Sequence, residues 1–222
     1  MKLIKLNKGM AAFISIAVLA IGGRASAQDS EQNGWFVRTG PVAVIFNPRI
    51  SLSLGGADVP GADVTIDNNY TETFELGYRF NRNWSVIATV GLPPWAELDG
   101  AGTISSAGTI GEISYGPSIL AAQYRFPIGD GRFEPYIGAG INYTIILDEK
   151  DRAASGVNVK SAFGPVLQVG FEYMFNNKMG MYFDVKKVWL NADATASLGG
   201  APVKANVTLD PLLIGTGLVW RF

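Results

Sequence analysis

Apolar and polar residues alternate along the C-terminal segment of the chain. Every second position carries an apolar side chain, with one threonine among them: Phe222, Trp220, Leu218, Thr216, Ile214 and Leu212. Successive side chains of a β-strand point to opposite faces, so this segment is predicted to be a strand with one apolar face. Such a strand crosses a bilayer when its apolar face contacts lipid and its other face lines a barrel. An ordinary amphipathic strand at the end of a soluble domain has the same local pattern.

Seven other segments show the same alternation. They span residues 35–46, 70–80, 84–91, 114–126, 133–145, 162–174 and 178–191, and the C-terminal strand begins at about residue 207. A tilted strand that crosses the hydrocarbon core needs a segment of about ten residues. Outside residues 1–27, no apolar run approaches the length of a membrane-spanning helix. We therefore predict an all-β fold, an eight-stranded antiparallel transmembrane β-barrel.

The connections between these segments fall into two classes that alternate along the chain. Short turns are predicted near residues 81, 129 and 176, whereas longer loops rich in Gly, Asp, Ser and Ala are predicted at residues 47–69, 92–113, 146–160 and 192–206. Outer-membrane barrels have short periplasmic turns and longer extracellular loops. The alternation therefore predicts which end of the barrel faces the periplasm.

Aromatic residues gather beside the short turns: Trp35, Tyr78, Phe80, Trp84, Tyr124, Phe126, Phe133, Tyr173, Trp220 and Phe222. A girdle of aromatic rings is typical of a membrane interface, where one side of the ring is apolar and the other is wet. A soluble barrel of the lipocalin type remains the structural alternative. It does not require apolar outward faces on nearly every strand.

The N-terminus has the features of a secretory signal peptide. Lys2, Lys5 and Lys8 precede an apolar run at residues 10–23, and Ala25-Ser26-Ala27 supplies the small residues of a cleavage site. A membrane anchor is the alternative, but the apolar run is shorter than the roughly 20 residues that a spanning helix needs. We predict that residues 1–27 are cleaved and that residues 28–222 form a single exported barrel domain.

Composition narrows the classes of partner. Cleavage leaves 14 basic and 19 acidic residues, and the chain has neither Cys nor His. Nucleic acid is therefore not an expected partner, and disulfides and thiolate metal sites are excluded. The carboxylates of the long loops match no calcium-binding spacing, so we expect no metal and no cofactor.

Four motifs occur in a fixed order. They are FEPYIGAGINYT at residues 133–144, GPVLQVGFEY at 164–173, DVKKVWLNAD at 184–193, and Leu209-Asp210-Pro211. With these motifs the chain resembles the OmpW family of small outer-membrane proteins over nearly the whole mature length. The resemblance implies an eight-stranded barrel with a narrow, largely apolar interior that passes small hydrophobic molecules. The aromatic end, Trp220 and Phe222, also resembles the assembly signal of bacterial outer-membrane barrels.

Charged residues occupy inward positions near the short turns. They are Arg38, Arg79, Arg125, Glu134, Glu172, Asp184 and Arg221. Unpaired charges in so narrow a lumen are costly, and arginine can hold a carboxylate with two parallel hydrogen bonds. We therefore predict that these seven residues form a charged periplasmic plug.

The inward positions nearer the long loops are mostly apolar. They are Val42, Val44, Ile119, Val166, Val188, Leu190, Pro211 and Leu213, and Gly140 and Gly164 leave space beside them. An eight-stranded barrel has room for side chains or one small ligand. We predict that these eight residues line a hydrophobic ligand above the plug.

The leading functional hypothesis is a channel for small hydrophobic molecules, which enter from outside and leave sideways into the membrane above the plug. Pro41, Pro117, Pro165 and Pro211 each remove a ladder hydrogen bond and could mark the opening, or they are tolerated at strand ends or bulges. A structural or adhesive barrel, or a phage or bacteriocin receptor without transport, is the alternative. Expected partners are outer-membrane lipids, lipopolysaccharide, the barrel-assembly machinery and small hydrophobic molecules.

An enzyme is the third class. Hydrolytic outer-membrane barrels generally use a histidine base, which this chain lacks. Glu134 and Glu172 are expected to be held ionised beside arginines, which does not suit a general acid. We expect no catalytic residue and no enzymatic activity.

Overall fold

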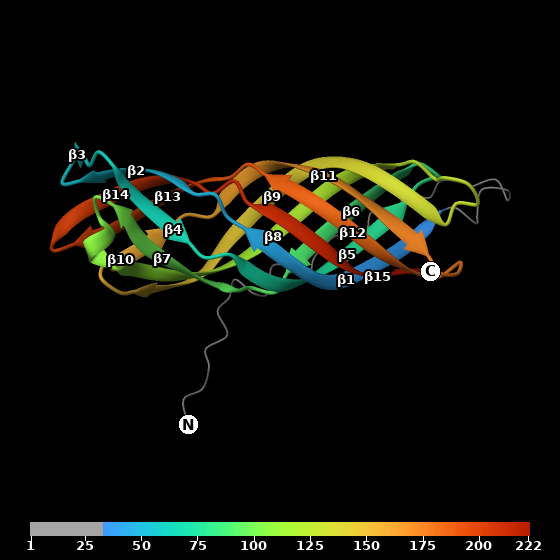
Figure 1. The fold of residues 1–222 in the computed structure, drawn as a ribbon, viewed down its shortest axis with the longest axis horizontal. Helices are drawn as coiled ribbons and strands as arrows, with labels where there is room; N and C mark the ends of the chain where they lie inside the picture. The colour runs from blue at the N-terminus through green and yellow to red at the C-terminus, as the bar shows by residue number, and fades with distance from the viewer. Residues whose placement is uncertain (1–32) are drawn as a thin grey trace, which may run out of the picture.

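Eight antiparallel strands form a closed barrel (Figure 1). They are β1 (Gly34–Ile45), β5 (Asn69–Arg79), β6 (Trp84–Gly91), β8 (Thr109–Arg125), β9 (Phe133–Asp151), β11 (Ala162–Met174), β12 (Met179–Val188) and β15 (Leu212–Arg221). Each strand pairs with the next in this order, and β15 pairs back with β1. The predicted fold is confirmed. This computed structural model describes residues 33–222, so the predicted signal peptide at residues 1–27 lies outside it.

The alternation along each strand decides which side chains enter the lumen. In β1, Phe36 and Arg38 are each 1% exposed, whereas Trp35 and Val37, which alternate with them, are 42% and 37% exposed. Their neighbour β5 pairs Trp35 with Tyr78 and Phe36 with Gly77, so like faces lie side by side around the wall. The outward apolar band is the surface that a lipid bilayer would cover. Within residues 33–222, no helix is both long and apolar enough to cross a membrane.

Asparagine and aspartate side chains order the short turns. The Asn81 Oδ1 atom accepts hydrogen bonds from the backbone N–H groups of Asn83 and Trp84, both at 2.9 Å. In the same way, the Asn176 Oδ1 atom accepts hydrogen bonds from the backbone N–H groups of Lys178 at 2.9 Å and Met179 at 2.8 Å. Such side chains mimic a backbone turn, which explains why the chain reverses in so few residues.

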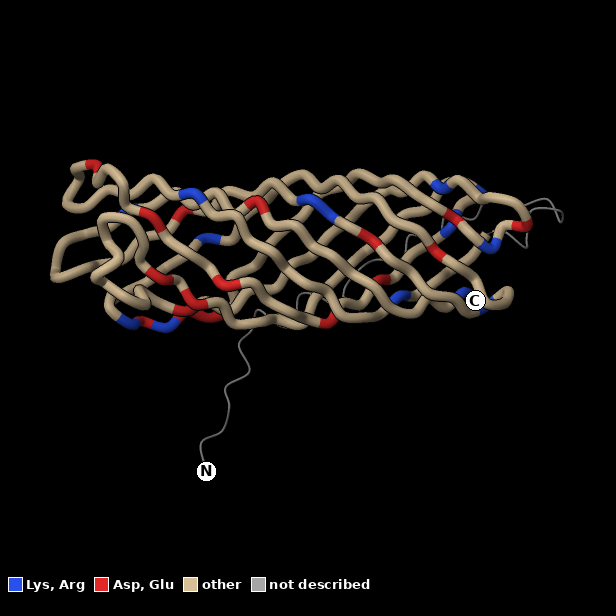
Figure 2. Tube along the Cα trace, viewed as in Figure 1, with Lys and Arg blue, Asp and Glu red and all other residues tan. Residues whose placement is uncertain are grey.

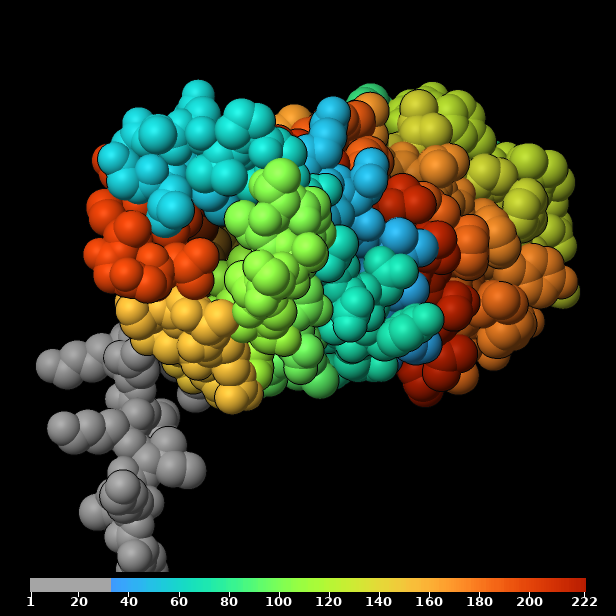
Figure 3. All heavy atoms as spheres, turned by 60° about the vertical axis from the view of Figure 1, so that its left-hand side comes forward, coloured from blue at the N-terminus to red at the C-terminus, as the bar shows by residue number. Residues whose placement is uncertain are grey.

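The long connections differ from the predicted irregular loops. They contain seven further strands: β2 (Arg49–Leu54), β3 (Ala57–Asp58), β4 (Ala62–Ile66), β7 (Trp95–Gly102), β10 (Ser155–Val159), β13 (Asn191–Leu198) and β14 (Ala201–Thr208). A short 3-10 helix, η1 (Ser105–Ala107), follows β7, and β8 and β9 also run well past their predicted limits. We call this part of the molecule the extension. Figure 3 shows its segments gathered at one end of the barrel, with a recess between the β13–β14 hairpin and the segment around η1.

The sequence did carry a signal for the extension. Val203, Ala205 and Val207 alternate with polar residues on β14 and face the interior of the extension, as Ile50 and Leu52 do on the neighbouring β2. These segments were nevertheless predicted as loops, because they are rich in Gly, Ser and Ala, which have weak preferences for strands. Pairing with neighbouring strands overrides these local preferences.

Aromatic side chains pack edge to face beside the short turns. Trp35 and Tyr78 have ring centroids 5.1 Å apart, and Trp84 and Tyr124 have centroids 5.0 Å apart. Tyr124 also packs edge to face against Phe126, and their ring centroids are 5.0 Å apart. Each pair joins neighbouring strands or successive outward positions, as expected for an interfacial girdle.

Candidate functional site

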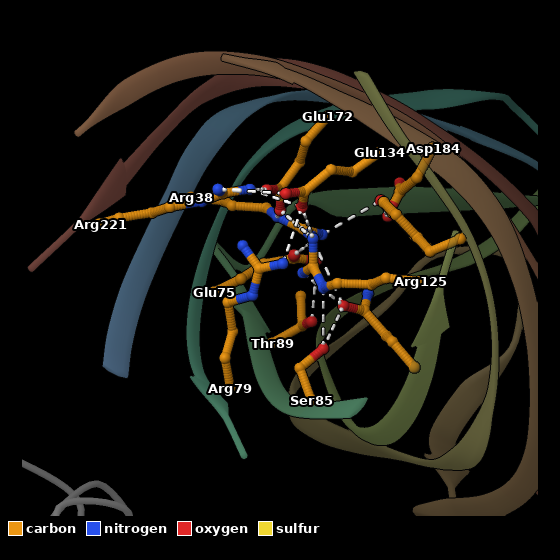
Figure 4. A network of polar contacts seen from close by, with 12 residues as sticks. Arg38, Glu75, Arg79, Ser85, Thr89, Arg125, Glu134, Glu172, Asp184 and Arg221 are labelled. Atoms are coloured by element: carbon orange, nitrogen blue, oxygen red, sulfur yellow. Dashed lines mark hydrogen bonds and ion pairs between the residues drawn. The ribbon is translucent and has the colours of Figure 1, made fainter. Parts of the chain in front are cut away.

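The structure brings the seven predicted plug residues together inside the barrel, in a single network that also contains Glu75 and Lys186 (Figure 4). We call these nine residues the charged cluster. They come from seven of the eight barrel strands, because inward positions on different strands meet at the same height. The sequence prediction of the plug included neither Glu75 nor Lys186. The signal for Lys186 was its spacing of two from Asp184 on the same strand face.

Arg38 and Glu172 lie at the centre of the charged cluster. The Arg38 Nε atom donates to Glu172 Oε1 at 2.8 Å, and its Nη1 atom donates to Glu75 Oε2 at 3.2 Å. Arg125 Nη1 lies 3.0 Å from the same Glu172 oxygen. Each buried charge therefore faces at least one opposite charge, which offsets part of its desolvation cost.

Three arginines converge on Glu134 nearer the short turns. Arg79 Nη2 and Arg221 Nη2 donate to Glu134 Oε2 at 2.9 Å and 2.7 Å, and Arg125 Nη1 lies 3.4 Å from it. Arg221 also contacts Glu172. This half of the cluster links β5, β8, β9, β11 and β15 across the lumen.

Lys186 holds the two remaining carboxylates on the side of the cluster nearer the extension. Its ammonium group lies 2.8 Å from Glu75 Oε1 and also contacts Asp184. The Thr89 hydroxyl donates to the same Glu75 oxygen at 3.0 Å, and Tyr136 donates its hydroxyl proton to Asp184 at 3.3 Å. Neutral donors thus supplement the ion pairs here.

Aromatic rings close the spaces between the charges. The Arg38 guanidinium lies 5.1 Å from the Phe36 ring centroid and 4.9 Å from that of Tyr136, within cation–π range. Phe36 occupies space that a side chain at Gly77 would need, since a Cβ there would lie 2.1 Å from the ring. Charges and rings pack closely enough at this height that Phe36 and Tyr136 are each 1% exposed and the Arg38 and Arg125 side chains are fully buried.

An apolar cavity of about 50 Å³ lies between the charged cluster and the extension. Five of the eight predicted lining residues contact it: Val44, Val188, Leu190, Pro211 and Leu213. The other three, Val42, Ile119 and Val166, are buried in the core cluster that includes Val44, Val188, Leu190 and Leu213. Gly140 and Gly164 leave no free space, because a Cβ at either would lie within 2.2 Å of a neighbouring backbone oxygen.

A second apolar cavity, of about 90 Å³, lies inside the extension. The two cavities share five lining residues, Ile66, Ile113, Val159, Ala192 and Leu209. All five lie in or beside segments that the sequence predicted as irregular loops, which is why none of them was predicted. The two cavities are therefore adjacent, one inside the extension and one between the extension and the charged cluster.

The pairing between β1 and β15 lapses at one point. It runs from Phe36 to Thr39, stops over Gly40 and Pro41, and resumes at Val42. Thr216, opposite the gap, donates its hydroxyl proton to the Tyr182 carbonyl at 2.9 Å. Proline has no N–H to donate, so Pro41 accounts for part of the interruption.

The other three prolines lie where pairing begins or ends. Pro117 directly precedes Ser118, the first residue of β8 paired with β6, and Pro165 precedes the first residue of β11 paired with β12, although both are paired with β9 on their other side; Pro211 precedes β15. These three fit tolerance at strand ends. Pro41 alone among the four interrupts a barrel pairing within its length.

Comparison with known proteins identifies the family. A family model described as the OmpW family matches residues 32–222. The chain belongs to the OmpW family. "Dibenzothiophene metabolism operon protein PahQ" of Pseudomonas aeruginosa is 36% identical over 198 residues, which cover 89% of this chain and 93% of the relative.

Two solved outer-membrane structures share the fold of this OmpW-family barrel. The crystal structure of OprG from Pseudomonas aeruginosa has a TM-score of 0.80 at 26% identity, covering 86% of this chain and 97% of OprG. The solid-state NMR structure of AlkL in DMPC bilayers has a TM-score of 0.70 at 31% identity, covering 90% of this chain and 94% of AlkL. The OmpW-family barrel is thus an outer-membrane protein, with its short turns toward the periplasm and its extension outside the cell.

The carboxylates of the extension form hydrogen bonds and ion pairs within the extension. Glu112 forms an ion pair with Lys150, with Oε2 3.1 Å from Lys150 Nζ, and a second ion pair with Arg152. Hydrogen bonds from Arg152 and, to a lesser extent, from Lys150 hold the Glu112 pKa below its usual range. The Asp151 carboxylate accepts the backbone N–H groups of Val157 and Gly156, which lowers its pKa. Within residues 33–222, no three Asp or Glu side chains form a group that could hold a metal ion.

Proposed function

We propose that this protein carries small hydrophobic molecules from outside the cell into the outer membrane. The molecule enters through the extension, passes through the two apolar cavities into the barrel, and leaves sideways above the charged cluster. The observation that carries this proposal is the adjacency of the two apolar cavities, which share five lining residues and lie one behind the other on the extension side of the charged cluster. Their small volumes require apolar side chains to change rotamer as a solute passes.

The charged cluster argues against an axial exit. An apolar molecule moving down the lumen would have to separate Arg38 from Glu172 and Glu75. Separating buried charges without a new partner costs about 3–5 kcal/mol for each broken pair. A lipid phase lies on the other side of the wall, so a sideways exit avoids this cost.

The gap at Gly40 and Pro41 supports an exit between β1 and β15. Inward-facing Gly40 lies between Arg38 of the charged cluster and Val42 of the apolar core, and Val44, the next inward residue, lines the first cavity. The strands are in close contact here, since a Cβ at Gly40 would lie 2.0 Å from the Thr216 carbonyl oxygen. The wall is closed in this conformation, and fewer ladder hydrogen bonds oppose its opening here.

Polycyclic aromatic compounds are the substrate class to test first. The relatives PahQ and DoxH are both named as dibenzothiophene metabolism operon proteins, and each is 36% identical to this chain. Dibenzothiophene is a compact, rigid apolar molecule without ionised groups. It suits a path lined by Val, Leu, Ile and Ala side chains.

Uptake by intact cells tests the proposal. An outer-membrane host without its own OmpW-family protein would express either this barrel or an empty vector, and the initial rate of dibenzothiophene uptake would be measured. We expect faster uptake with the barrel, and no change for a hydrophilic solute such as glucose. Equal dibenzothiophene rates would favour a structural, adhesive or receptor role instead. Faster entry of both solutes would contradict the closed lumen.

Assembly and lipid contacts complete the proposal. Trp220 and Phe222 are 44% and 77% exposed at the end of the last strand, where barrel-assembly machinery could bind them. The polar outer face of β2, β13 and β14 forms a groove that includes Ser51, Asp193, Lys204 and Asn206. We propose that this face lies among the sugars of lipopolysaccharide, and that residues 1–27 are removed during export.

A further inference from the structure

We propose that the periplasmic mouth of the barrel binds a compact anion between Arg79 and Arg221. The first observation is a local imbalance of charge. The part of the charged cluster nearer the periplasm contains three arginines, Arg79, Arg125 and Arg221, but only two carboxylates, Glu134 and Glu172, and Glu172 also pairs with Arg38. An excess of buried positive charge in a low-dielectric interior favours a bound negative ion.

Unpartnered donors mark the position of this site. The Nε atoms of Arg79 and Arg221 are buried and have no hydrogen-bond partner among residues 33–222. Both guanidiniums use Nη2 to hold Glu134 Oε2, so the two groups lie beside one another. Among the described residues Arg79 donates only through Nη2, whereas Arg221 donates through both Nη atoms, so each arginine retains at least its Nε–H as a donor. A buried donor without a partner costs about 1–3 kcal/mol.

The exposure of the cluster shows the direction of access. The Arg79 and Arg221 side chains are 9% and 19% exposed, whereas those of Arg38, Arg125 and Glu172 are fully buried. An anion from the periplasm therefore meets these two residues before the central ion pairs, and small movements of their side chains would expose the buried Nε–H groups to it. Within the described residues, the ion pairs of Arg79 and Arg221 involve only Glu134 and Glu172, and the C-terminal carboxylate forms none with them.

The donor set fits a compact monovalent anion. Each arginine offers at least its Nε–H, and the two guanidiniums lie side by side on Glu134, so one small anion beside them can accept from both. Chloride and the carboxylate of a small periplasmic solute share this chemistry. A bound anion would neutralise the mouth and stabilise the periplasmic end of the charged cluster. This inference concerns the cluster alone and does not depend on the proposed transport.

Thermal unfolding of the refolded barrel at constant ionic strength tests the proposal. The unfolding midpoint would be followed in sodium gluconate, whose anion is bulky, and in sodium chloride or sodium acetate. We expect chloride and acetate to raise the midpoint saturably, by about 5 °C at 100 mM for millimolar affinity. A rise with acetate alone would assign the site to carboxylates, and no rise with either anion would overturn the proposal.

Two variants separate anion binding from a merely structural role. Arg79→Met should abolish the dependence on chloride, whereas Arg82→Met, in the exposed turn nearby, should retain it. Glu134→Gln removes a carboxylate from the site and should increase the response to chloride. Broadening of the ³⁵Cl NMR line by wild-type protein, lost in Arg79→Met, provides a direct measurement of binding. Equal broadening by both proteins, or a weaker response in Glu134→Gln, would contradict the site.

Discussion

Arg38 and Glu172 form a buried ion pair across the lumen, with Arg38 Nε 2.8 Å from Glu172 Oε1 and neither side chain exposed to solvent. Their strands, β1 and β11, are not neighbours in the wall, because β15 and β12 lie between them. The pair therefore connects opposite parts of the barrel. It fixes the lumen in a closed state that hydrogen bonding between neighbouring strands does not by itself require.

Breaking this pair should destabilise the whole barrel. Glu172→Leu removes a carboxylate that Arg38, Arg125 and Arg221 all contact, and it leaves Arg38 with Glu75 alone and Arg125 and Arg221 with Glu134 alone, so buried positive charge exceeds its counter-charge. We expect a loss of about 3–5 kcal/mol in the free energy of unfolding. Urea titration of the refolded protein in detergent micelles, followed by tryptophan fluorescence, measures this change.

A matched control comes from an exposed ion pair in a turn. Arg132 Nε lies 3.2 Å from Asp130 Oδ2, and the side chains of Asp130 and Arg132 are 67% and 61% exposed. Asp130→Asn should change the free energy of unfolding by less than about 0.5 kcal/mol. Equal effects of the two substitutions would mean that the central pair contributes no more than a surface contact does.

Crosslinks on both sides of the Gly40–Pro41 gap should block the sideways exit. Thr39 is paired with Leu218 and Ala43 with Ile214, and the wild-type chain has no cysteine. We expect the variant with cysteines at these four positions to lose dibenzothiophene uptake when oxidised and to regain it on reduction. Initial uptake rates in intact cells measure the effect.

The matched crosslink lies in a pairing without a gap. Val169 and Val185 are paired between β11 and β12, where the register is continuous. A disulfide there should leave uptake unchanged. If the crosslinks flanking the gap also have no effect, the solute leaves by another route.

Filling the junction of the two cavities should stop entry. Ala192 is 5% exposed and lines both cavities, so a larger side chain there narrows the point where they meet. We expect Ala192→Phe to reduce dibenzothiophene uptake to the level of the empty vector and to cost about 1–3 kcal/mol in stability. Ala122→Phe, on the exposed outer face of β8, provides the control and should retain uptake. Normal uptake by Ala192→Phe would exclude this path.

Acid should loosen the extension before it unfolds the barrel. The backbone N–H groups of Val157 and Gly156 hold the Asp151 pKa below its usual value, so the ionised form stabilises the folded state. That stabilisation is fully present above the unfolded pKa and is lost as the pH falls through the lower folded pKa. Pepsin should therefore cleave the extension increasingly below about pH 4. Asp151→Ala should be cleaved at higher pH, and equal cleavage profiles would contradict the role of Asp151.

Export should remove the N-terminal segment. The Ala25-Ser26-Ala27 sequence predicts cleavage before Gln28. N-terminal sequencing of protein purified from outer membranes should therefore begin at Gln28. Retention of Met1 in membrane-inserted protein would instead indicate an anchor.

Local sequence predicted the strands that carry an apolar residue at every second position. Residues 162–174 alternate so regularly that the predicted limits equal those of β11, and the prediction placed Glu172 on the correct face. The same reasoning placed Arg38 and Arg221 in the lumen. It did not predict that both contact Glu172, because the height of a residue in the barrel depends on strand tilt and stagger.

The sequence by itself determined the eight strands, the faces they present and the end that carries the charges, because alternation with a period of two is a local property. Only the tertiary structure decided that Lys186 bridges Glu75 and Asp184, that the extension holds a second apolar cavity adjacent to the first, and that β1 and β15 lose pairing at Pro41. Each of these depends on register between segments far apart in the chain. The closed barrel fixes that register through all its pairings at once, and no single segment encodes it.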